Sequence, residues 1–260
     1  MSDKLLAVVG IPRSGSTAVY EAIRVEGKLQ GVCEPGNPIM AQYQSEAIRD
    51  ICEPLVHGRK RQADGLVKYL VNHGIELVKL MLAEASYTTL KMSGFPSLVG
   101  CELVRKVVVT YRENVFRQAL SMCIACKTGF WHGNPSEFHC TDIGKLHAPL
   151  FGQTLSLFRA QNNFLLDVAS HNLNKDKLIT CKYEDFFEGG CDQSAHWERL
   201  FQFLGYDYDS SLLERINSKR YNSPHTYSCV DNLSELEDVY AEFTSSDKSC
   251  SDLLEELPSK

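Results

Sequence analysis

The chain has 260 residues, 43% of them hydrophobic and 10% aromatic, which suits one α/β domain with a full core and argues against wholesale disorder. A formal net charge of −6 and a pI near 5.8 disfavour general nucleic-acid binding, which needs a basic face. No stretch is long and apolar enough for a transmembrane helix, and no leader segment is recognisable. We therefore expect a cytoplasmic protein, without membrane or nucleic-acid partners, whose ten cysteines are mostly thiols.

The predicted elements alternate between strand and helix. The apolar run 5–9 predicts a strand buried on both faces, and a helix is expected over 16–25. A short strand at 29–33, a helix over 38–56 and a helical pattern over 66–82, weakened at Gly74, come next. Further along we expect strands over 87–92, 105–111 and 177–182, and helices over 114–127, 149–171, 183–188, 194–204, 210–216 and 234–243.

This alternation predicts the fold class α/β, with a P-loop-like central parallel sheet flanked by helices on both faces. We expect a single domain over residues 1–244. Residues 245–260 are rich in serine and acidic side chains, so a flexible C-terminal tail is predicted there.

The most informative stretch is the loop between the first predicted strand and the first predicted helix, GIPRSGST from Gly10 to Thr17. Small residues let the backbone close around an anion, and the N–H groups at a helix start point toward it. The spacing of Gly10 and Gly15 matches a nucleotide-binding P-loop, but Ser16 stands where the lysine is expected. The sequence therefore predicts a phosphate-binding loop that works without that lysine.

Three motifs in this order resemble those of sulfotransferases that use 3′-phosphoadenosine 5′-phosphosulfate (PAPS). The loop resembles the 5′-phosphosulfate loop in its Pro-Arg-Ser-Gly form, as in tyrosylprotein and bacterial small-molecule sulfotransferases. Residues 107–121 are similar to the 3′-phosphate strand and helix, and residues 182–186 (KYEDF) to the element that closes the nucleotide site. The resemblance implies a sulfotransferase fold, PAPS as donor, 3′-phosphoadenosine 5′-phosphate (PAP) as product, and no required metal.

The resemblance also implies which residues bind the nucleotide. They are Arg13, Ser14, Gly15, Ser16, Thr17, Arg112, Ser121, Tyr183, Lys219 and Arg220. Arg112 and Ser121 lie nine positions apart, where cytosolic family members usually show eight. Arg117 and the segment 217–232 are left open as further parts of the 3′-phosphate site.

Sulfuryl transfer needs a base for the acceptor and positive charge for the leaving phosphate. Cytosolic sulfotransferases use the histidine of a Lys-x-His motif, and in the corresponding Lys91-Met92-Ser93 this histidine is missing. In the Pro-Arg-Ser-Gly branch the base is a glutamate shortly after the first helix, which points to Glu34. The expected catalytic residues are Glu34 as base, Arg13 at the leaving phosphate and Lys91 at the sulfonate oxygens.

Each assignment has an ordinary structural alternative. Glu34 precedes a proline and suits a turn, Lys91 suits a solvated surface, and Ser16 and Thr17 suit helix caps. Tyr183 suits a buried core position. Histidines 132, 139 and 147 are reserve candidates for the base, and Cys123-x2-Cys126 lacks the further ligands of a zinc site, so no metal is expected.

The expected acceptor is a hydroxyl, less favourably an amine, of a small molecule such as a bacterial natural product. A guanidine alkaloid of the cylindrospermopsin or saxitoxin type is one expectation, because an acidic pocket favours a polar or cationic alcohol. Two other functions stay open: an ATP-dependent small-molecule kinase or other P-loop nucleotide-binding protein, and a non-catalytic nucleotide-binding module. Ser16 at the lysine position counts against the first.

Overall fold

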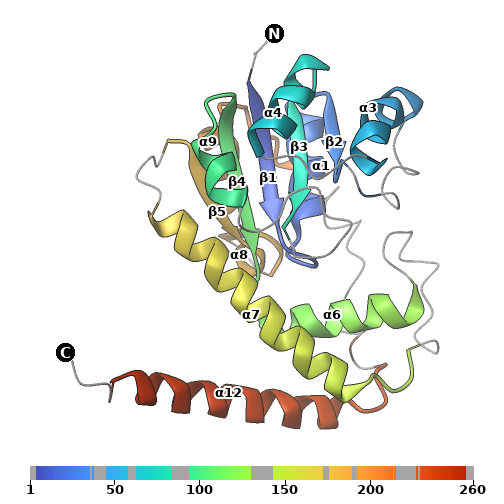
Figure 1. Cartoon of the computed structure of the whole chain (residues 1–260), viewed down its shortest axis with the longest axis vertical. Coiled ribbons are helices and arrows are strands. Elements are labelled where there is room, and N and C mark those ends of the chain that lie inside the picture. Colours follow the sequence, from blue (N-terminus) through green and yellow to red (C-terminus); the bar gives the residue numbers. More distant parts are fainter. Residues whose placement is uncertain are drawn as a thin grey trace. The chain divides into compact units, whose positions relative to one another are not determined.

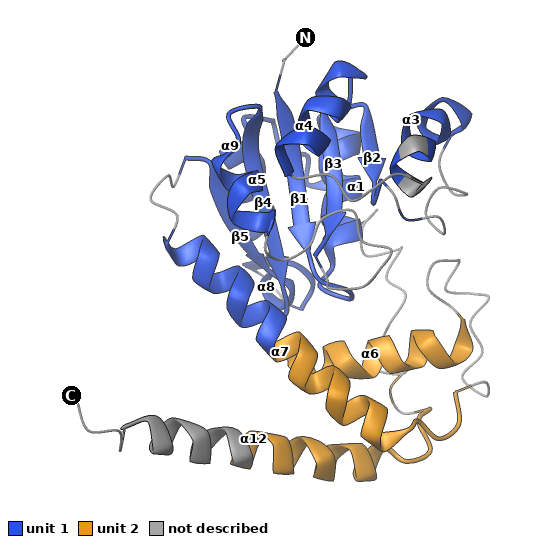
Figure 2. Ribbon diagram, in the orientation of Figure 1, with its two compact units in different colours: residues 1–113, 160–218 blue, residues 114–159, 219–260 orange. Residues whose placement is uncertain are grey.

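A computed structural model describes residues 4–35, 37, 45–57, 63–82, 94–129, 143–171, 176–188, 192–212, 214, 227 and 229–255. The chain forms two compact units: unit 1 comprises residues 1–113 and 160–218, and unit 2 comprises residues 114–159 and 219–260 (Figure 2). The helices and strands, most of them labelled in Figure 1, are β1 Leu5–Gly10, α1 Ser16–Glu26, β2 Gly31–Cys33, α3 Glu46–His57, α4 Ala63–Asn72, β3 Leu77–Met81, α5 Phe95–Gly100, β4 Val104–Tyr111, α6 Val115–Thr128, α7 Ala148–His171, β5 Leu178–Lys182, α8 Tyr183–Phe187, α9 Gln193–Leu204 and α12 Leu233–Glu255.

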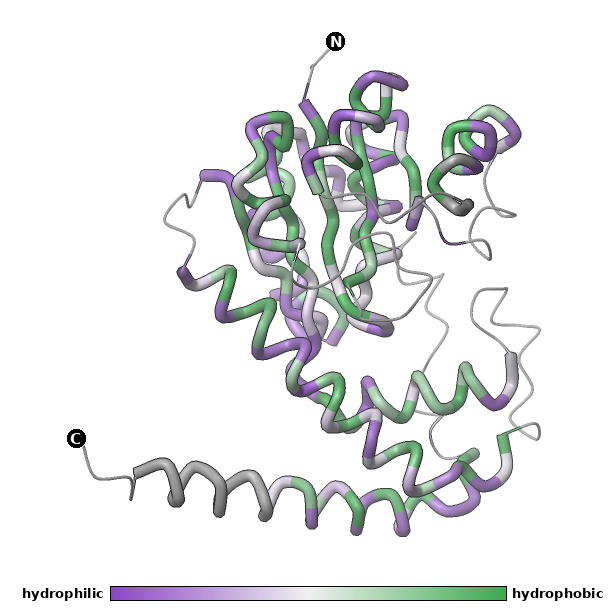
Figure 3. Tube along the Cα trace, viewed as in Figure 1, coloured by the Kyte–Doolittle hydropathy of each residue, from purple (hydrophilic) through white to green (hydrophobic). Residues whose placement is uncertain are grey.

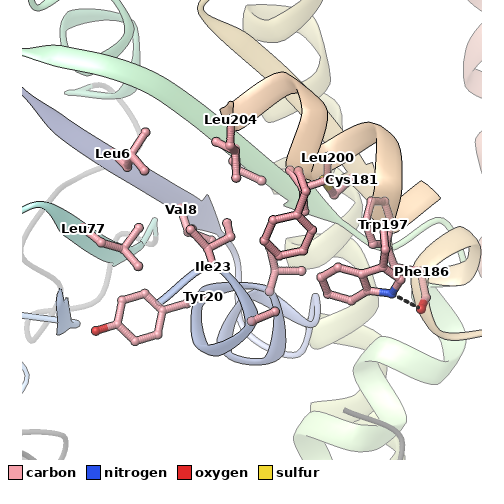
Figure 4. Close-up of a cluster of buried hydrophobic side chains, with 14 of the residues drawn as sticks. Leu6, Val8, Tyr20, Ile23, Leu77, Cys181, Phe186, Trp197, Leu200 and Leu204 are labelled. Carbon is pink, nitrogen blue, oxygen red and sulfur yellow. Dashed lines mark hydrogen bonds between the residues drawn. The ribbon is translucent and has the colours of Figure 1, made fainter. Parts of the chain in front are cut away.

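The strands of the described residues form one sheet in unit 1, in the order β2-β3-β1-β4-β5, and every pair is parallel. Leu6 and Val8 of β1 point into a hydrophobic cluster with α1 and α9 (Figure 4). Because side chains alternate along a strand, Leu5, Ala7 and Val9 point to the other face, where they are equally buried. The parallel sheet, covered on both faces of its central strand, confirms the predicted fold class.

The cluster on the α1 side is a hydrophobic core of unit 1. It includes Trp197 of α9, which is fully buried and donates a hydrogen bond from Nε1 to the carbonyl of Phe186 at 3.2 Å (Figure 4). This bond satisfies the only polar atom of the indole, as a buried tryptophan requires. Hydrophobic residues also follow the length of β1 in Figure 3. The core thereby fixes α8 and α9 against the sheet.

Unit 2 is helical and includes α6, the first half of α7 and α12. The ring of Phe116 in α6 contacts Phe151 of α7 and Tyr240 of α12, with centroid separations of 5.4 and 5.2 Å. Asn232 joins the start of α12 to Leu146, since its side chain pairs with both the N–H and the carbonyl of that residue. Cys229 is in a disulfide, so the expectation of thiols is wrong at this position.

The stretch 66–82 differs from the prediction of a helix with one weak point. It contains α4, a turn at Gly74 with φ +73°, and then the strand β3. Leu70, Val78 and Leu82 have helical spacing, but 77–82 is also an apolar run interrupted only by Lys79. Pairing with β1 and β2 decided between these patterns, and such non-local pairing is invisible to periodicity.

Other predicted element boundaries also differ from those in the structure or lie outside its described residues. Of the predicted helix over 38–56, the second half is confirmed by α3, Ser45 is not helical, and 38–44 lies outside the described residues. The strand expected at 87–92 lies outside the described residues, and α12 runs beyond the predicted end at 243. The division into a domain over 1–244 and a tail over 245–260 stays a prediction. Within the described ranges, no helix combines the length and apolar character needed to cross a membrane.

Candidate functional site

The loop from Gly10 to α1 is tightly built. A methyl group at Gly10 would come within 2.3 Å of Thr110 Oγ1 and 2.6 Å of Ser14 Oγ, so only glycine fits there. These two hydroxyls are themselves hydrogen-bonded at 2.9 Å, which ties the loop to β4. Arg13 and Gly15 have positive φ angles of 64° and 80°, and they turn the chain into α1.

The start of α1 is left without a side-chain cap. Gly15 is the N-cap residue and makes no side-chain bond, and the hydroxyls of Ser16 and Thr17 contact β3 instead. The helix-capping interpretation of these two residues is therefore not supported. Because the first N–H groups of a helix have no partner within it, this end can receive an anion's oxygens.

Lys79 of β3 is the functional candidate that the sequence interpretation missed. Its side chain is only 2% exposed, and Nζ donates to Thr17 Oγ1 at 2.7 Å and to Glu34 Oε1 at 2.5 Å. A lysine this buried is almost always paired, so a lone lysine inside an apolar run was the available signal. Lys79 thus links the helix that follows the loop to the proposed base.

Glu34 lies directly after β2, beside Lys79 in the neighbouring strand. Its backbone N–H bonds the Lys79 carbonyl at 2.8 Å, and its φ of 49° is left-handed, an uncommon conformation for a residue other than glycine. Asn37 donates to Glu34 Oε2 at 2.7 Å and closes the turn through its own N–H. Glu34 is therefore a turn residue and also a carboxylate held at both oxygens.

Burial raises the pKa of the Cys33 thiol to about 11, although nearby Lys79 acts in the opposite direction. The thiol is therefore neutral at physiological pH. Lys79 consequently has Glu34, and not Cys33, as its anionic partner at this end of β2 and β3.

Arg112 follows β4 and is only 3% exposed. Its guanidinium carbon lies 4.0 Å from the centre of the Tyr183 ring, Nη2 lies 3.4 Å from Glu188 Oε1, and Nε lies 3.8 Å from Glu184 Oε1. Asn162 fixes the Arg112 backbone by donating to its carbonyl at 2.9 Å. The arginine expected to bind a phosphate is thus held rigidly, and within the described part of the chain its Nε has no hydrogen-bond acceptor.

Tyr183 connects Arg112 to the loop. A methyl group at Gly15 would lie 2.9 Å from the Tyr183 ring and 2.8 Å from that of Phe187, so both rings of α8 cover this glycine. Because the Tyr183 ring also faces Arg112, the loop and the arginine meet at one aromatic side chain. The expected nucleotide residues of unit 1 therefore form one continuous group.

The remaining candidates belong to unit 2 or to stretches that the structure does not describe. Ser121 is buried in α6 of unit 2, where Asn114 caps the helix by accepting from the N–H of Arg117 at 2.9 Å. His147 Nδ1 accepts from the Leu150 N–H at the start of α7, which gives it a structural role. Lys91, Lys219, Arg220, His132 and His139 lie outside the described residues.

The described residues contain no cluster of three or more histidine, cysteine or acidic side chains suited to a metal ion. Cys123 lies buried in α6, and burial raises the pKa of its thiol to about 11. A thiol with a raised pKa is a poor metal ligand because binding needs the thiolate.

No family model and no curated protein matches this sequence. Among solved structures, mouse sulfotransferase SULT7A1 complexed with PAP is 15% identical, with a TM-score of 0.43 over 84% of this chain and 63% of that one. The sulfotransferase domain from the curacin biosynthetic pathway is 14% identical, with a TM-score of 0.46 over 93% and 97%. A sugar kinase from Janibacter sp. is 12% identical, with a TM-score of 0.37 over 78% and 94%.

The chain thus spans less than two thirds of the mouse sulfotransferase. Similarity at these identities and TM-scores does not identify a reaction. The function of this chain has to be inferred from its own residues.

Proposed function

We propose that this chain is a PAPS-dependent sulfotransferase whose acceptor is a hydroxyl group of a small molecule. The observation that carries the proposal is the contact of Lys79 with both Thr17 and Glu34. Through this contact, a predicted phosphate-binding loop that lacks the P-loop lysine is connected to a buried cation and to a fixed carboxylate. Because a kinase can also use a carboxylate as base, it is Ser16 in place of the P-loop lysine that favours the sulfotransferase over an ATP site.

In the proposed reaction the acceptor oxygen attacks sulfur, and the bond from sulfur to the 5′-phosphate oxygen of the donor breaks. The acceptor proton passes to Glu34, and the products are a sulfate ester and PAP. As a carboxylate, Glu34 can accept this proton, since such a group offers about four lone-pair positions.

We assign to Lys79 the neutralisation of the sulfonate oxygens that was first expected of Lys91. Its ammonium is already beside Thr17 at the start of α1, where the loop N–H groups point. Arg13 is proposed to stabilise the leaving 5′-phosphate, and the loop residues 14–17 to bind it. Arg112, whose Nε has no acceptor among the described residues, is proposed to receive the 3′-phosphate, with Ser121, Lys219 and Arg220 as further contacts.

The decisive experiment is an acceptor screen with sulfur-labelled PAPS, using wild type, Glu34→Gln and the control Glu21→Gln. Glu21 is a half-exposed carboxylate on α1 that pairs with Arg24. We expect Glu34→Gln to lower kcat about 10²–10⁴-fold while PAP still binds, as for removal of a general base. An unchanged rate would remove Glu34 from the mechanism and return attention to the histidines of 132–147.

Two measurements on the wild-type protein distinguish the proposed sulfotransferase from a kinase and from a non-catalytic module. A kinase should be stabilised against heat by ATP with Mg²⁺ more than by PAP without metal, and a sulfotransferase should show the reverse. A non-catalytic module would bind PAP but transfer sulfate to no acceptor in the screen.

For the acceptor we propose a polar or cationic alcohol, with guanidine alkaloids of the cylindrospermopsin or saxitoxin type as the first compounds to test. The support is the acidic character of the chain, at a net charge of −6. Preferential sulfation of neutral phenols over cationic alcohols would contradict this choice without affecting the reaction type.

A further inference from the structure

The surroundings of Arg112 are unusual for a phosphate site. In the described part of unit 1, carboxylates outnumber cations around the guanidinium, so the local charge is negative. Besides Arg112 the cation is Lys182, and the carboxylates are Glu113, Glu184, Asp185 and Glu188. Lys182 is engaged by Glu113 at 3.3 Å and Asp185 at 3.2 Å, which leaves Glu184 and Glu188 to face Arg112. A phosphate that approaches this arginine meets two anions already in place.

The two carboxylates facing Arg112 are held differently. Glu184 is in the first turn of α8, where its second oxygen accepts from the Glu113 N–H at 3.1 Å, and its distance of 3.8 Å to Arg112 Nε is too long for a hydrogen bond. Glu188 is at the C-terminal end of α8, where a helix gives no stabilisation to an anion, and its carboxylate bonds Nη2 at 3.4 Å.

The exposed fractions of Glu188 and Arg112 also differ. The Glu188 side chain is 27% exposed, so its carboxylate can turn into water at little cost. Arg112 is 3% exposed, its backbone is anchored by Asn162, and Tyr183 covers one face of the guanidinium. Of the two members of this ion pair, Glu188 is the more accessible to water.

We propose that Glu188 is an internal competitor for the phosphate site at Arg112. A phosphate that binds Arg112 in bidentate fashion through Nε and Nη2 competes with the Glu188 carboxylate at Nη2, so exchange of one anion for the other affects the affinity. This inference rests on the proposed function, in which Arg112 receives the 3′-phosphate. Glu188 thereby lowers the affinity for every 3′-phosphorylated nucleotide, including the product PAP, whose release each turnover requires.

The test is calorimetric titration of the full chain with PAP and with AMP, which lacks the 3′-phosphate. In Glu188→Gln we expect the Kd of PAP to fall about two- to fivefold, the equivalent of one partly exposed ion pair, and the Kd of AMP to stay constant. Asp185→Asn is the matched control, because it removes one charge from the same helix but pairs with Lys182. It should change both affinities alike and only slightly.

Glu188→Asp gives an independent measurement if the glutamine variant folds poorly. It keeps the charge but shortens the side chain by one methylene, so PAP should bind more tightly than to wild type and less tightly than to Glu188→Gln. Weaker PAP binding in either variant would overturn the proposal, since Glu188 would then hold Arg112 in place for the phosphate. Equal gains in Glu188→Gln and Asp185→Asn would also overturn it, by showing a general charge effect.

Failure of the underlying function has a different signature. If wild type binds PAP and AMP equally, and Arg112→Ala changes neither affinity, then Arg112 binds no 3′-phosphate. The inference then fails together with the proposed 3′-phosphate site. If Arg112→Ala abolishes a preference for PAP while Glu188→Gln weakens PAP binding, only the inference fails.

Discussion

Lys79 and Glu34 form an ion pair of 2.5 Å between neighbouring parallel strands, and the two partners differ in burial: the lysine side chain is 2% exposed and the glutamate 12%. Loss of either partner therefore has unequal consequences. Without Glu34 a charge remains that water cannot reach, whereas without Lys79 the carboxylate keeps some access to solvent.

This asymmetry predicts different losses of stability. Glu34→Ala should lower the free energy of unfolding by about 3 kcal/mol or more, as when a buried pair loses one member, and Lys79→Met should cost clearly less. Urea unfolding of both variants measures the difference, with the double variant Lys79→Met/Glu34→Gln as a control that removes both charges. Equal losses would mean that Lys79 is hydrated or neutral after Glu34 is removed.

Arg13 combines a left-handed backbone with the proposed contact to the leaving phosphate. Arg13→Gly should abolish sulfuryl transfer but leave stability equal or higher, because a non-glycine residue pays about 1–2 kcal/mol in this conformation. Arg13→Lys should keep part of the activity and none of the gain in stability. Near-normal turnover of Arg13→Gly in the labelled-donor assay would exclude the arginine from the mechanism.

Gly15 tests the contact between the loop and α8. Gly15→Ala should destabilise the protein and weaken PAP binding, because its methyl group would lie 2.8 Å from Phe187 and 2.9 Å from Tyr183 at a φ of 80°. Gly74→Ala is the control: its φ is 73°, and no described atom lies within 4 Å of the added methyl group. Thermal unfolding should show a larger loss of stability for Gly15→Ala than for Gly74→Ala. Equal losses would mean that backbone strain alone, and not contact with α8, explains the effect.

Buried thiols predict a loss of stability at alkaline pH. Burial raises the pKa of Cys33, Cys52 and Cys123 from 9.0 to about 11. Between these values the unfolded chain loses the protons that the folded chain keeps, so rising pH favours unfolding. The contribution is complete below pH 9 and is lost as the pH approaches about 11.

Unfolding free energies of wild type and Cys52→Ala across this window measure the effect. The alanine variant should show a shallower decline with pH, because the Cys52 thiol no longer titrates. Parallel declines would assign the pH dependence to other groups.

The sequence was sufficient for the features that local chemistry determines. The continuous apolar run of β1, the glycines of the loop and the start of α1 all appear where they were predicted, and Glu34 follows β2 as expected. These features depend on residues close to one another in the chain. Patterns of burial and backbone conformation are sufficient to identify them.

The residues that were missed depend on partners far along the chain. Lys79 contacts Thr17 across 62 positions, and Glu188, which was not predicted, contacts the predicted Arg112 across 76. Helical spacing over 66–82 concealed β3, because only pairing with β1 and β2 distinguishes it from a helix. Lys79 has one local signature, a charge inside an apolar run, whereas the anions at Arg112 have none beyond the residue type.

The strand order β2-β3-β1-β4-β5 has a consequence for how such a protein could acquire a new substrate. In the proposed reaction the base belongs to the β2 side of the central strand, and the residues for the nucleotide belong to the loop and the β4–β5 side. The two tasks are thus assigned to opposite halves of one sheet. Substitutions in the segments after β2 can change which alcohol is accepted while donor recognition is inherited intact, and directed evolution can begin there.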